Sequence, residues 1–269
     1  MIADVTPETE EKRLRYSVPA LEKGLDILEY LAEQAVPVTQ AHVARALNRQ
    51  PGELFRMLTC LEGRGYLHRD AGSNGYVLSL RLFELSRIHS PHEALLRAAR
   101  PLMRALADEV RESCHLSVLH RGSVLVLSQE ESPRAFRLSV EVGSQHPPMR
   151  TTSGRLLLAG LEPEALADTL ADQADWANAD ETRRSGFVQQ LDMIRRTGFH
   201  HSTGERFVGG ADIGVLVGGH GSAVNAALTI ARLIETDMPS DIESFTRPLA
   251  TCAAAIAHRA GLIARTPPA

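Results

Sequence analysis

Aromatic residues are scarce in this sequence: Phe, Trp and Tyr together make up 4% of its 269 residues. Any core must therefore be mainly aliphatic, and the hydrophobic share of 43% is sufficient for ordinary globular cores. A chain of this length favours two domains over one.

Cysteines are few, and long apolar runs are absent. The three cysteines, Cys60, Cys114 and Cys252, form no C-x-x-C pair, so we expect no metal or other cofactor and a reduced, cytoplasmic setting. No apolar run approaches the roughly 20 residues of a membrane span, and residues 1–15 lack the apolar core of a signal peptide. We therefore expect no membrane partner and a flexible polar tail over residues 1–16.

Excess positive charge is absent, because the net charge is −4, and this argues against a protein that coats nucleic acid. The charge is unevenly distributed, however. Residues 36–90 contain more arginines than acidic residues, whereas residues 91–269 contain more acidic than basic residues. A mildly basic N-terminal region followed by an acidic C-terminal region is consistent with a DNA-binding domain confined to the N-terminal region.

The most informative stretch is residues 39–79. Thr39 suits the N-cap of a short helix to about residue 47, and Pro51 suits the first position of a second helix that stops at Gly65. The second helix has an apolar stripe at helical spacing: Leu54, Met57, Leu58 and Leu61. Residues 66–69 and 76–79 alternate around Asn74-Gly75, which predicts a hairpin.

A helix pair followed by a hairpin is a winged helix-turn-helix, whose second helix enters the major groove and whose hairpin lies along the backbone or minor groove. The same pattern occurs in protein–protein modules and inside enzymes. Arg45, Arg49 and Arg56 favour DNA, whereas Glu53 would repel phosphate.

Helical spacing predicts further helices over residues 17–34, 81–88, 91–100 and 101–112, the last two separated by Pro101. From residue 113 the pattern changes to period two, with a polar loop predicted over residues 174–184. We expect strands at 115–120, 124–129, 135–142, 199–203, 213–217 and 225–231, and a loop at 143–149. Helices are expected after Arg155 and at 163–171, 186–196 and 240–258, the last kinked at Pro248. Hairpins interspersed with helices indicate a largely antiparallel sheet backed by helices.

Three segments in this order resemble the IclR family of bacterial transcription regulators: FRMLTCLEGRGYL (55–67), TSGRLLLA (152–159) and IRRTGFHHSTGERFVGGADIGVLV (194–217). The resemblance covers residues 17–261. It implies an α+β protein in which an N-terminal winged helix-turn-helix is joined by a linker helix to a GAF-like domain. The expected divisions are a tail (1–16), the DNA-binding domain (17–89), linker helices (90–112) and the GAF-like effector domain (113–265).

The expected partners follow from this resemblance: double-stranded operator DNA, a small organic or aromatic acid effector, and further copies in a homodimer or a dimer of dimers. Many relatives begin the recognition helix with Lys-Ser-Thr, where this chain has Pro51-Gly52-Glu53. The arginines must then supply more of the anchoring. The expected DNA contacts are Thr39, Gln40, Arg45, Arg49, Gly52, Arg56, Thr59, His68 and Arg69.

Two of these DNA contacts have a plainer alternative. Arg56 could instead pair with Glu53, three residues earlier on the helix, or with another nearby acid, and Arg69 could be only a solvated surface charge.

The effector pocket is expected where a helix begins after Thr152-Ser153-Gly154, because free amides at a helix N-terminus favour a carboxylate. Plain capping by Thr152 or Ser153 is the alternative. By resemblance, the pocket residues are Met149, Thr152, Ser153, Gly154, Ser202, Thr203, Glu205, Ile213, Leu216 and Thr229, with Met149, Ile213 and Leu216 as apolar walls.

Enzymatic interpretations are weaker. Thr152-Ser153-Gly154-Arg155 is not a G-x-S-x-G nucleophile elbow. His200 and His201 are adjacent on a predicted strand and point to opposite faces, so they cannot readily share a metal. The prediction is a ligand-responsive DNA-binding regulator rather than an enzyme. The alternatives are a regulator whose second domain only assembles the oligomer, or a small-molecule enzyme or partner-binding module that has lost DNA.

Overall fold

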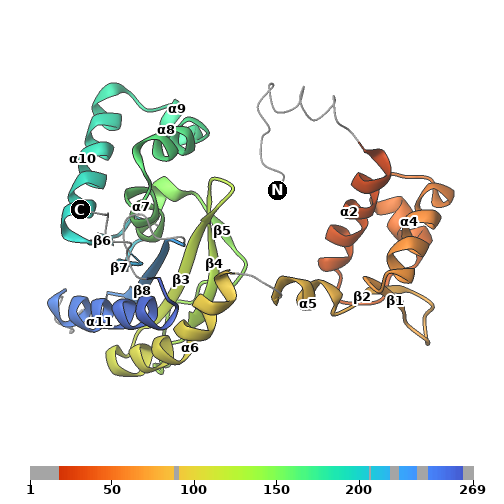
Figure 1. Cartoon of the computed structure of the whole chain (residues 1–269), viewed down its shortest axis with the longest axis horizontal. Coiled ribbons are helices and arrows are strands. Elements are labelled where there is room, and N and C mark those ends of the chain that lie inside the picture. Colours follow the sequence, from red (N-terminus) through yellow and green to blue (C-terminus); the bar gives the residue numbers. More distant parts are fainter. Residues whose placement is uncertain (1–17, 88–90, 206, 219–223, 235–241, 263–269) are drawn as a thin grey trace. The chain divides into compact units, whose positions relative to one another are not determined.

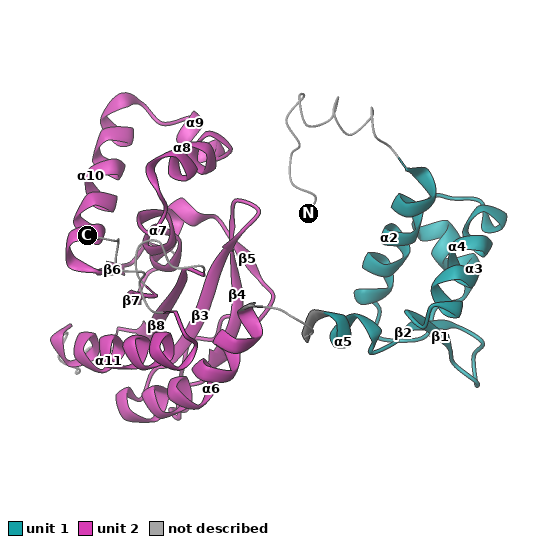
Figure 2. Ribbon diagram, in the orientation of Figure 1, with its two compact units in different colours: residues 1–89 teal, residues 90–269 magenta. Residues whose placement is uncertain are grey.

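The structure, a computed structural model, describes residues 18–87, 91–205, 207–218, 224–234 and 242–262. The predicted tail over residues 1–16 lies outside this range. The chain divides into two compact units, residues 1–89 and 90–269 (Figure 2).

Unit 1 contains the predicted helix-turn-helix and hairpin. Its elements in order are α2 (Pro19–Ala32), α3 (Gln40–Ala46), α4 (Pro51–Gly63), β1 (Leu67–Arg69), β2 (Tyr76–Leu78) and α5 (Arg81–Arg87). Pro51 begins α4 as predicted, and Gly65 follows its end with φ of +77°. The two strands pair antiparallel, with His68 opposite Val77. Unit 1 is thus a winged helix-turn-helix.

The core of unit 1 is aliphatic, as the composition predicted. The buried face of α4 consists of Leu54 and Leu58, which pack with Ile27 of α2 and Val43 of α3. Because this face is buried, the opposite face of α4 is left open to solvent.

Unit 2 is built on a six-stranded antiparallel sheet in the order β5-β4-β3-β8-β7-β6 (Figure 1). The strands are β3 (Ser113–His120), β4 (Ser123–Glu130), β5 (Gln145–His146), β6 (Phe199–Thr203), β7 (Gly210–Val217) and β8 (Ala226–Leu233). Helices α6 (Pro91–Val110) and α11 (Glu243–Arg259) cover one face. The other face carries the short helix η1 (Pro148–Arg150) and helices α7 (Thr152–Ala159), α8 (Pro163–Ala171), α9 (Ala174–Ala177) and α10 (Glu181–Thr197).

Alternation along the strands separates the two faces of the sheet. Ile213 and Val215 of β7 and Leu228 of β8 belong to the core under α6 and α11. Leu216 of β7 and Ala227 of β8 belong to the core under α7 and α10. The same alternation decides which residues can reach a site beside α7.

The prediction that Pro101 separates two helices is wrong, because α6 runs unbroken from Pro91 to Val110. Proline removes only one backbone hydrogen bond, and Pro101 itself is exposed. Ala99 and Met103 on either side of it are fully buried against the sheet, so packing holds the helix together. The helix expected as a linker is therefore part of the core of unit 2.

Three other predictions for unit 2 were wrong. Residues 135–142 form no strand, and the edge partner of β4 is instead β5, inside the predicted loop 143–149. The polar stretch 174–184 contains α9 and the start of α10, where the side chain of Asp180 caps the helix by accepting from the Arg183 amide at 2.8 Å. Gly210 rather than Ile213 begins β7.

Candidate functional sites

The open face of α4 carries the expected DNA contacts Gly52, Arg56 and Thr59, all of which are exposed. Arg45 and Arg49, from α3 and the turn after it, are exposed as well. None of the three arginines forms an ion pair within the described part of the chain. They are therefore available to phosphate, and their contact with DNA stays a prediction.

The alternative pairing of Arg56 with Glu53 is wrong. Glu53 instead pairs with Lys23 of α2, at 2.8 Å between Nζ and Oε1. This hydrogen bond and charge lower the pKa of the Glu53 carboxyl. The negative charge on α4 is thus matched by a neighbouring helix, and Arg56 is left free.

Gln40 and Thr39 lie at the start of α3. Gln40 Nε2 donates to the carbonyl oxygen of Pro51 at 2.8 Å, which ties α3 to the first residue of α4. Thr39 occupies the N-cap position, but its side chain makes no capping hydrogen bond, contrary to the sequence prediction. Gln40 therefore positions the second helix, and a DNA contact by either residue stays a prediction.

Arg69 in the wing is exposed, but its guanidinium has partners within unit 1. Its Nη2 donates to the Tyr76 hydroxyl at 2.6 Å, and its guanidinium lies 4.8 Å from the centre of that ring. Glu62 on α4 approaches its Nε at 3.3 Å. These contacts hold the hairpin against α4, and a DNA contact by Arg69 stays a prediction. His68 beside it is exposed and stays a prediction.

Unit 2 contains a cavity of about 330 Å³ between the sheet, the start of α7 and the segment 131–142, which we call the strap. The strap contributes Leu138, Ser139, Val140 and Glu141 to its wall. The other lining residues are His115, Ser144, His146, Thr151, Ser153, Phe207, Asp212 and Ala231.

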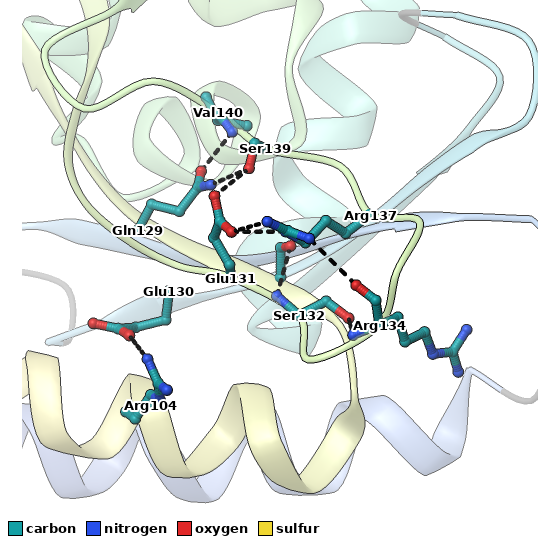
Figure 3. Close-up of polar contacts among 10 residues, drawn as sticks. Arg104, Gln129, Glu130, Glu131, Ser132, Arg134, Arg137, Ser139 and Val140 are labelled. Carbon is teal, nitrogen blue, oxygen red and sulfur yellow. Dashed lines mark hydrogen bonds and ion pairs between the residues drawn. The ribbon is translucent and has the colours of Figure 1, made fainter.

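Side-chain hydrogen bonds replace strand pairing along the strap (Figure 3). Gln129 Nε2 donates to Ser139 Oγ at 2.9 Å, and the side-chain oxygen Oε1 of Gln129 accepts from the Val140 amide. Glu131 accepts from Ser139 Oγ at 3.0 Å and from Arg137 Nε at 2.7 Å. These bonds place Leu138 and Val140 over the cavity without the ladder that the sequence predicted.

The start of α7 forms one end of the cavity. Thr151 Oγ1 caps the helix by accepting from the Gly154 amide at 3.0 Å, so the predicted capping by Thr152 or Ser153 is wrong. The Gly154 amide is therefore already occupied. The amides of Thr152 and Ser153 have no acceptor within the helix, because they lie in its first turn. Ser153 is 4% exposed, lines the cavity and has no side-chain partner among the described residues.

Other predicted pocket residues form a polar layer under α7. Thr152 and Ser202 share a buried hydrogen bond of 2.8 Å between their hydroxyls. The Thr229 hydroxyl is buried and has no partner within the described chain. Ser202 and Glu205 line a smaller hollow beside the cavity, together with Phe207 and Asp212.

Several predicted pocket residues lie elsewhere. Ile213 faces α6 and α11 on the opposite side of the sheet, so its prediction was wrong. Leu216 and Met149 are partly buried in the core under α7 rather than in the cavity wall. Thr203 is exposed, and Glu205 forms an ion pair with Arg155. Of the predicted set, only Ser153 lines the cavity itself.

His115 is the main residue that the sequence analysis missed. It is 7% exposed, lines the cavity and has no hydrogen-bond partner in the described part of the chain. Burial, with a smaller effect of His146, lowers its pKa to about 4, so it is neutral at pH 7. No local pattern marks it, because its neighbours Thr229 and Gln129 come from two other strands.

Acid should destabilise the chain through its buried histidines. The pKa values of His115 and His200 are both lowered from 6.5 to about 4, chiefly by burial. Between these values the unfolded chain binds the protons that the folded chain excludes, so stability falls as pH falls from about 6.5 towards 4. The expected loss is on the order of 1 kcal/mol per pH unit for each histidine. Urea unfolding at pH 7 and pH 5 should therefore show a smaller pH-dependent loss for His115→Gln than for the wild type. Equal losses would contradict this role.

The described residues contain no group of three potential metal ligands, and no described helix is long and apolar enough to cross a membrane. His200 is buried and His201 exposed, as expected for adjacent strand positions. Cys114 and Cys252 are buried, whereas Cys60 is exposed.

Comparison with known proteins identifies both units. Residues 90–258 match the model of the bacterial transcriptional regulator IclR C-terminal domain, and residues 20–71 match the IclR helix-turn-helix domain. The HTH-type transcriptional regulator KdgR of Dickeya chrysanthemi is 27% identical over 218 residues, covering 80% of this chain and 71% of that protein. The glycerol operon regulatory protein of Streptomyces griseus is 24% identical and covers 91% of this chain and 97% of that protein.

Solved structures show the same fold. An IclR homologue from Microbacterium hydrocarbonoxydans, complexed with 4-hydroxybenzoate, matches with a TM-score of 0.73. It is 22% identical, and the match covers 90% of this chain and 99% of that one.

Proposed function

This chain belongs to the IclR family of bacterial transcriptional regulators, and we propose that it couples operator binding by unit 1 to a small organic acid bound in the cavity of unit 2. The family fixes the general function: a DNA-binding regulator with an effector-binding C-terminal domain, and not an enzyme. The nature of the effector is the part that we infer from the cavity.

The observation that carries this proposal is the Ser153 hydroxyl at the start of α7, which lines the cavity and has no hydrogen-bond partner among the described residues. Ser153 Oγ and the first amides of α7 lie at one end, and no side chain of the described chain occupies them. Hydrogen-bond donors at a helix N-terminus attract a carboxylate, aided by the helix dipole. We infer that the effector carboxylate binds there, with Ser153 donating to it.

The rest of the cavity favours a hydroxylated acid with an apolar body. Leu138, Val140 and Phe207 supply apolar wall, and the volume of about 330 Å³ suits a single-ring or similarly small compound. Glu141 and Asp212 also line the cavity, and carboxylates there would repel a second acid group. A hydroxyl on the effector could donate to one of these carboxylates or to the neutral His115. An aromatic hydroxy acid such as 4-hydroxybenzoate has this arrangement of groups.

Operator binding is proposed to use two or four copies of the chain, as a homodimer or a dimer of dimers. An exposed apolar stripe on α2, formed by Leu21 (60% exposed) and Leu25 (47%), offers a contact between heads. Two recognition helices about one DNA turn apart would then enter successive major grooves of a palindromic site. A regulator of this kind acts in the cytoplasm, where bacterial DNA lies.

The effector regulates DNA binding only if it binds the DNA-competent and DNA-incompetent arrangements with different affinity. By the same linkage, operator DNA must change the affinity for the effector by an equal factor. Effector binding and operator binding should therefore be measured on the same full-length chain.

Thermal shift with a panel of small organic acids, including 4-hydroxybenzoate, tests the cavity. A binding acid at 100 times its Kd stabilises the chain by about 2.7 kcal/mol and raises its melting temperature. Ser153→Ala should reduce affinity for that acid by about 10- to 100-fold, because a hydrogen bond to a charged group contributes about 1.5–3 kcal/mol. Ser185→Ala, an exposed serine on α10, is the matched control and should behave as the wild type.

Two results would count against the proposed cavity. If an acid binds equally well to the wild type and Ser153→Ala, its carboxylate lies elsewhere. If no acid in the panel shifts the melting temperature, the alternative in which unit 2 only assembles the oligomer is favoured.

A further inference from the structure

Glu53 is a carboxylate on the helix that should face DNA, where negative charge is unfavourable. It is the third residue of α4, and its side chain is 44% exposed. The N-terminal residues of a recognition helix are those that contact base edges. Gly52 beside it carries no side chain, and a Cβ there would meet nothing within 4 Å, so the approach to Glu53 is open.

The structure holds this carboxylate in place and in its charged form. Lys23 Nζ donates to Glu53 Oε1 at 2.8 Å from the neighbouring helix α2. That contact is the main cause of the lowered pKa of Glu53. Glu53, Lys23 and Arg56 line the same hollow, of about 460 Å³, between α2 and α4. The start of α4 is itself fixed by the bond from Gln40 to the Pro51 carbonyl.

A carboxylate that is exposed, fixed in position and paired with a lysine can accept a hydrogen bond from a base. We propose that Glu53 reads a cytosine in the operator by accepting a hydrogen bond from the N4 amino group in the major groove, and that Lys23 is its positioning residue. This role rests on the operator binding proposed above. Exposed Arg45, Arg49 and Arg56 supply the phosphate contacts, so Glu53 need not approach the backbone.

Cytosine is favoured over the other bases by the pattern of groups in the major groove. Guanine and thymine present only acceptors or a methyl group there, which a carboxylate cannot use. Adenine offers an amino donor, but its N7 acceptor lies alongside and would repel the second carboxylate oxygen. Cytosine N4 is a donor without such an acceptor on its own ring. Glutamine at the same position would instead suit adenine, because its amide both accepts from N6 and donates to N7.

In vitro selection from a randomised double-stranded DNA library, with the full-length chain, tests this role. The wild type should enrich a motif with an invariant cytosine in each half-site, and replacing that C·G pair by T·A should weaken binding by about 5- to 150-fold. Glu53→Gln should change the preference at that position to adenine, and Glu53→Ala should abolish the preference. The other positions of the motif should be unchanged in both variants.

Two further variants separate base recognition by Glu53 from the general effect of charge on DNA binding. Lys23→Met should weaken binding to all sequences, because the charge of Glu53 loses its partner, and should also reduce the preference for cytosine, because the carboxylate is no longer held in place. Glu33→Gln, which removes an exposed acid at the end of α2, is the matched control and should leave the motif unaltered. Melting temperatures of all variants check folding.

The possible contrary results are distinguishable. A motif that Glu53→Ala and Glu53→Gln both select unchanged would overturn the role of Glu53 but leave operator binding intact. A folded wild-type chain that enriches no motif would overturn the proposed operator reading, and the role of Glu53 with it.

Discussion

Replacing Arg56 by alanine is expected to weaken operator binding by about 10- to 100-fold without unfolding the chain. Arg56 is exposed on the open face of α4, and its only nearby acid on the helix, Glu53, is paired with Lys23. No hydrogen bond or ion pair within the described chain would therefore be lost with the side chain. Binding measured across a salt series should also show a slope smaller by about 1 if Arg56 contacts a phosphate.

The matched control for Arg56 is Arg196→Ala. Arg196 is likewise an exposed arginine on a helix, but it lies on α10 of unit 2. This variant should bind the operator as the wild type does. Operator affinity that is unchanged in Arg56→Ala would remove Arg56 from the DNA interface, whatever the control shows.

Replacing Gly154 by alanine should strongly lower the stability of unit 2. A Cβ at this position would lie 2.5 and 2.6 Å from Cα and C of Pro148, and closer still to its carbonyl oxygen. These are backbone atoms, so η1 or α7 must move. Overpacking of this kind costs about 3 kcal/mol or more, which lowers the melting temperature of a domain of this size by about 5–10 °C. Acid binding should be lost together with the geometry of the α7 N-terminus.

Gly186→Ala is the control for Gly154→Ala. Gly186 is also helical, but a Cβ there meets nothing within 4 Å, so alanine should stabilise α10 by up to about 1 kcal/mol. A Gly154→Ala chain that melts at the wild-type temperature and still binds the acid would show that Pro148 and α7 are not in the contact described.

Local patterns were sufficient to predict unit 1. Pro51 marks the start of α4, and the spacing of Leu54 and Leu58 identifies its buried face, because both signals lie within a few residues of chain. The partner of Glu53 was not predictable in this way. Lys23 is 30 residues earlier, and only the packing of α2 on α4 brings it to 2.8 Å.

Unit 2 shows where sequence patterns failed. The sequence of the strap alternates as in a strand, yet the strap is held by hydrogen bonds from the side chains of Gln129 and Glu131 and not by strand pairing. These hydrogen bonds depend on the tertiary arrangement, which local patterns do not show. Ile213 and Leu216 were both assigned to the pocket, although residues three apart on a strand face opposite sides, so this error could have been avoided. His115 could not have been found, because the pairing of β3 with β8 places it beside the cavity.

The central claim is that unit 1 binds a specific operator and that a ligand in unit 2 changes this binding. The most direct test is titration of the purified full-length chain against its own upstream intergenic DNA, in a salt series, with and without an acid found by thermal shift. We expect saturable binding by two or four chains per site that survives competitor DNA, weakens log-linearly with salt and changes in affinity when the acid is added. A folded chain that binds this DNA no better than competitor DNA at low salt, with or without the acid, would contradict the account.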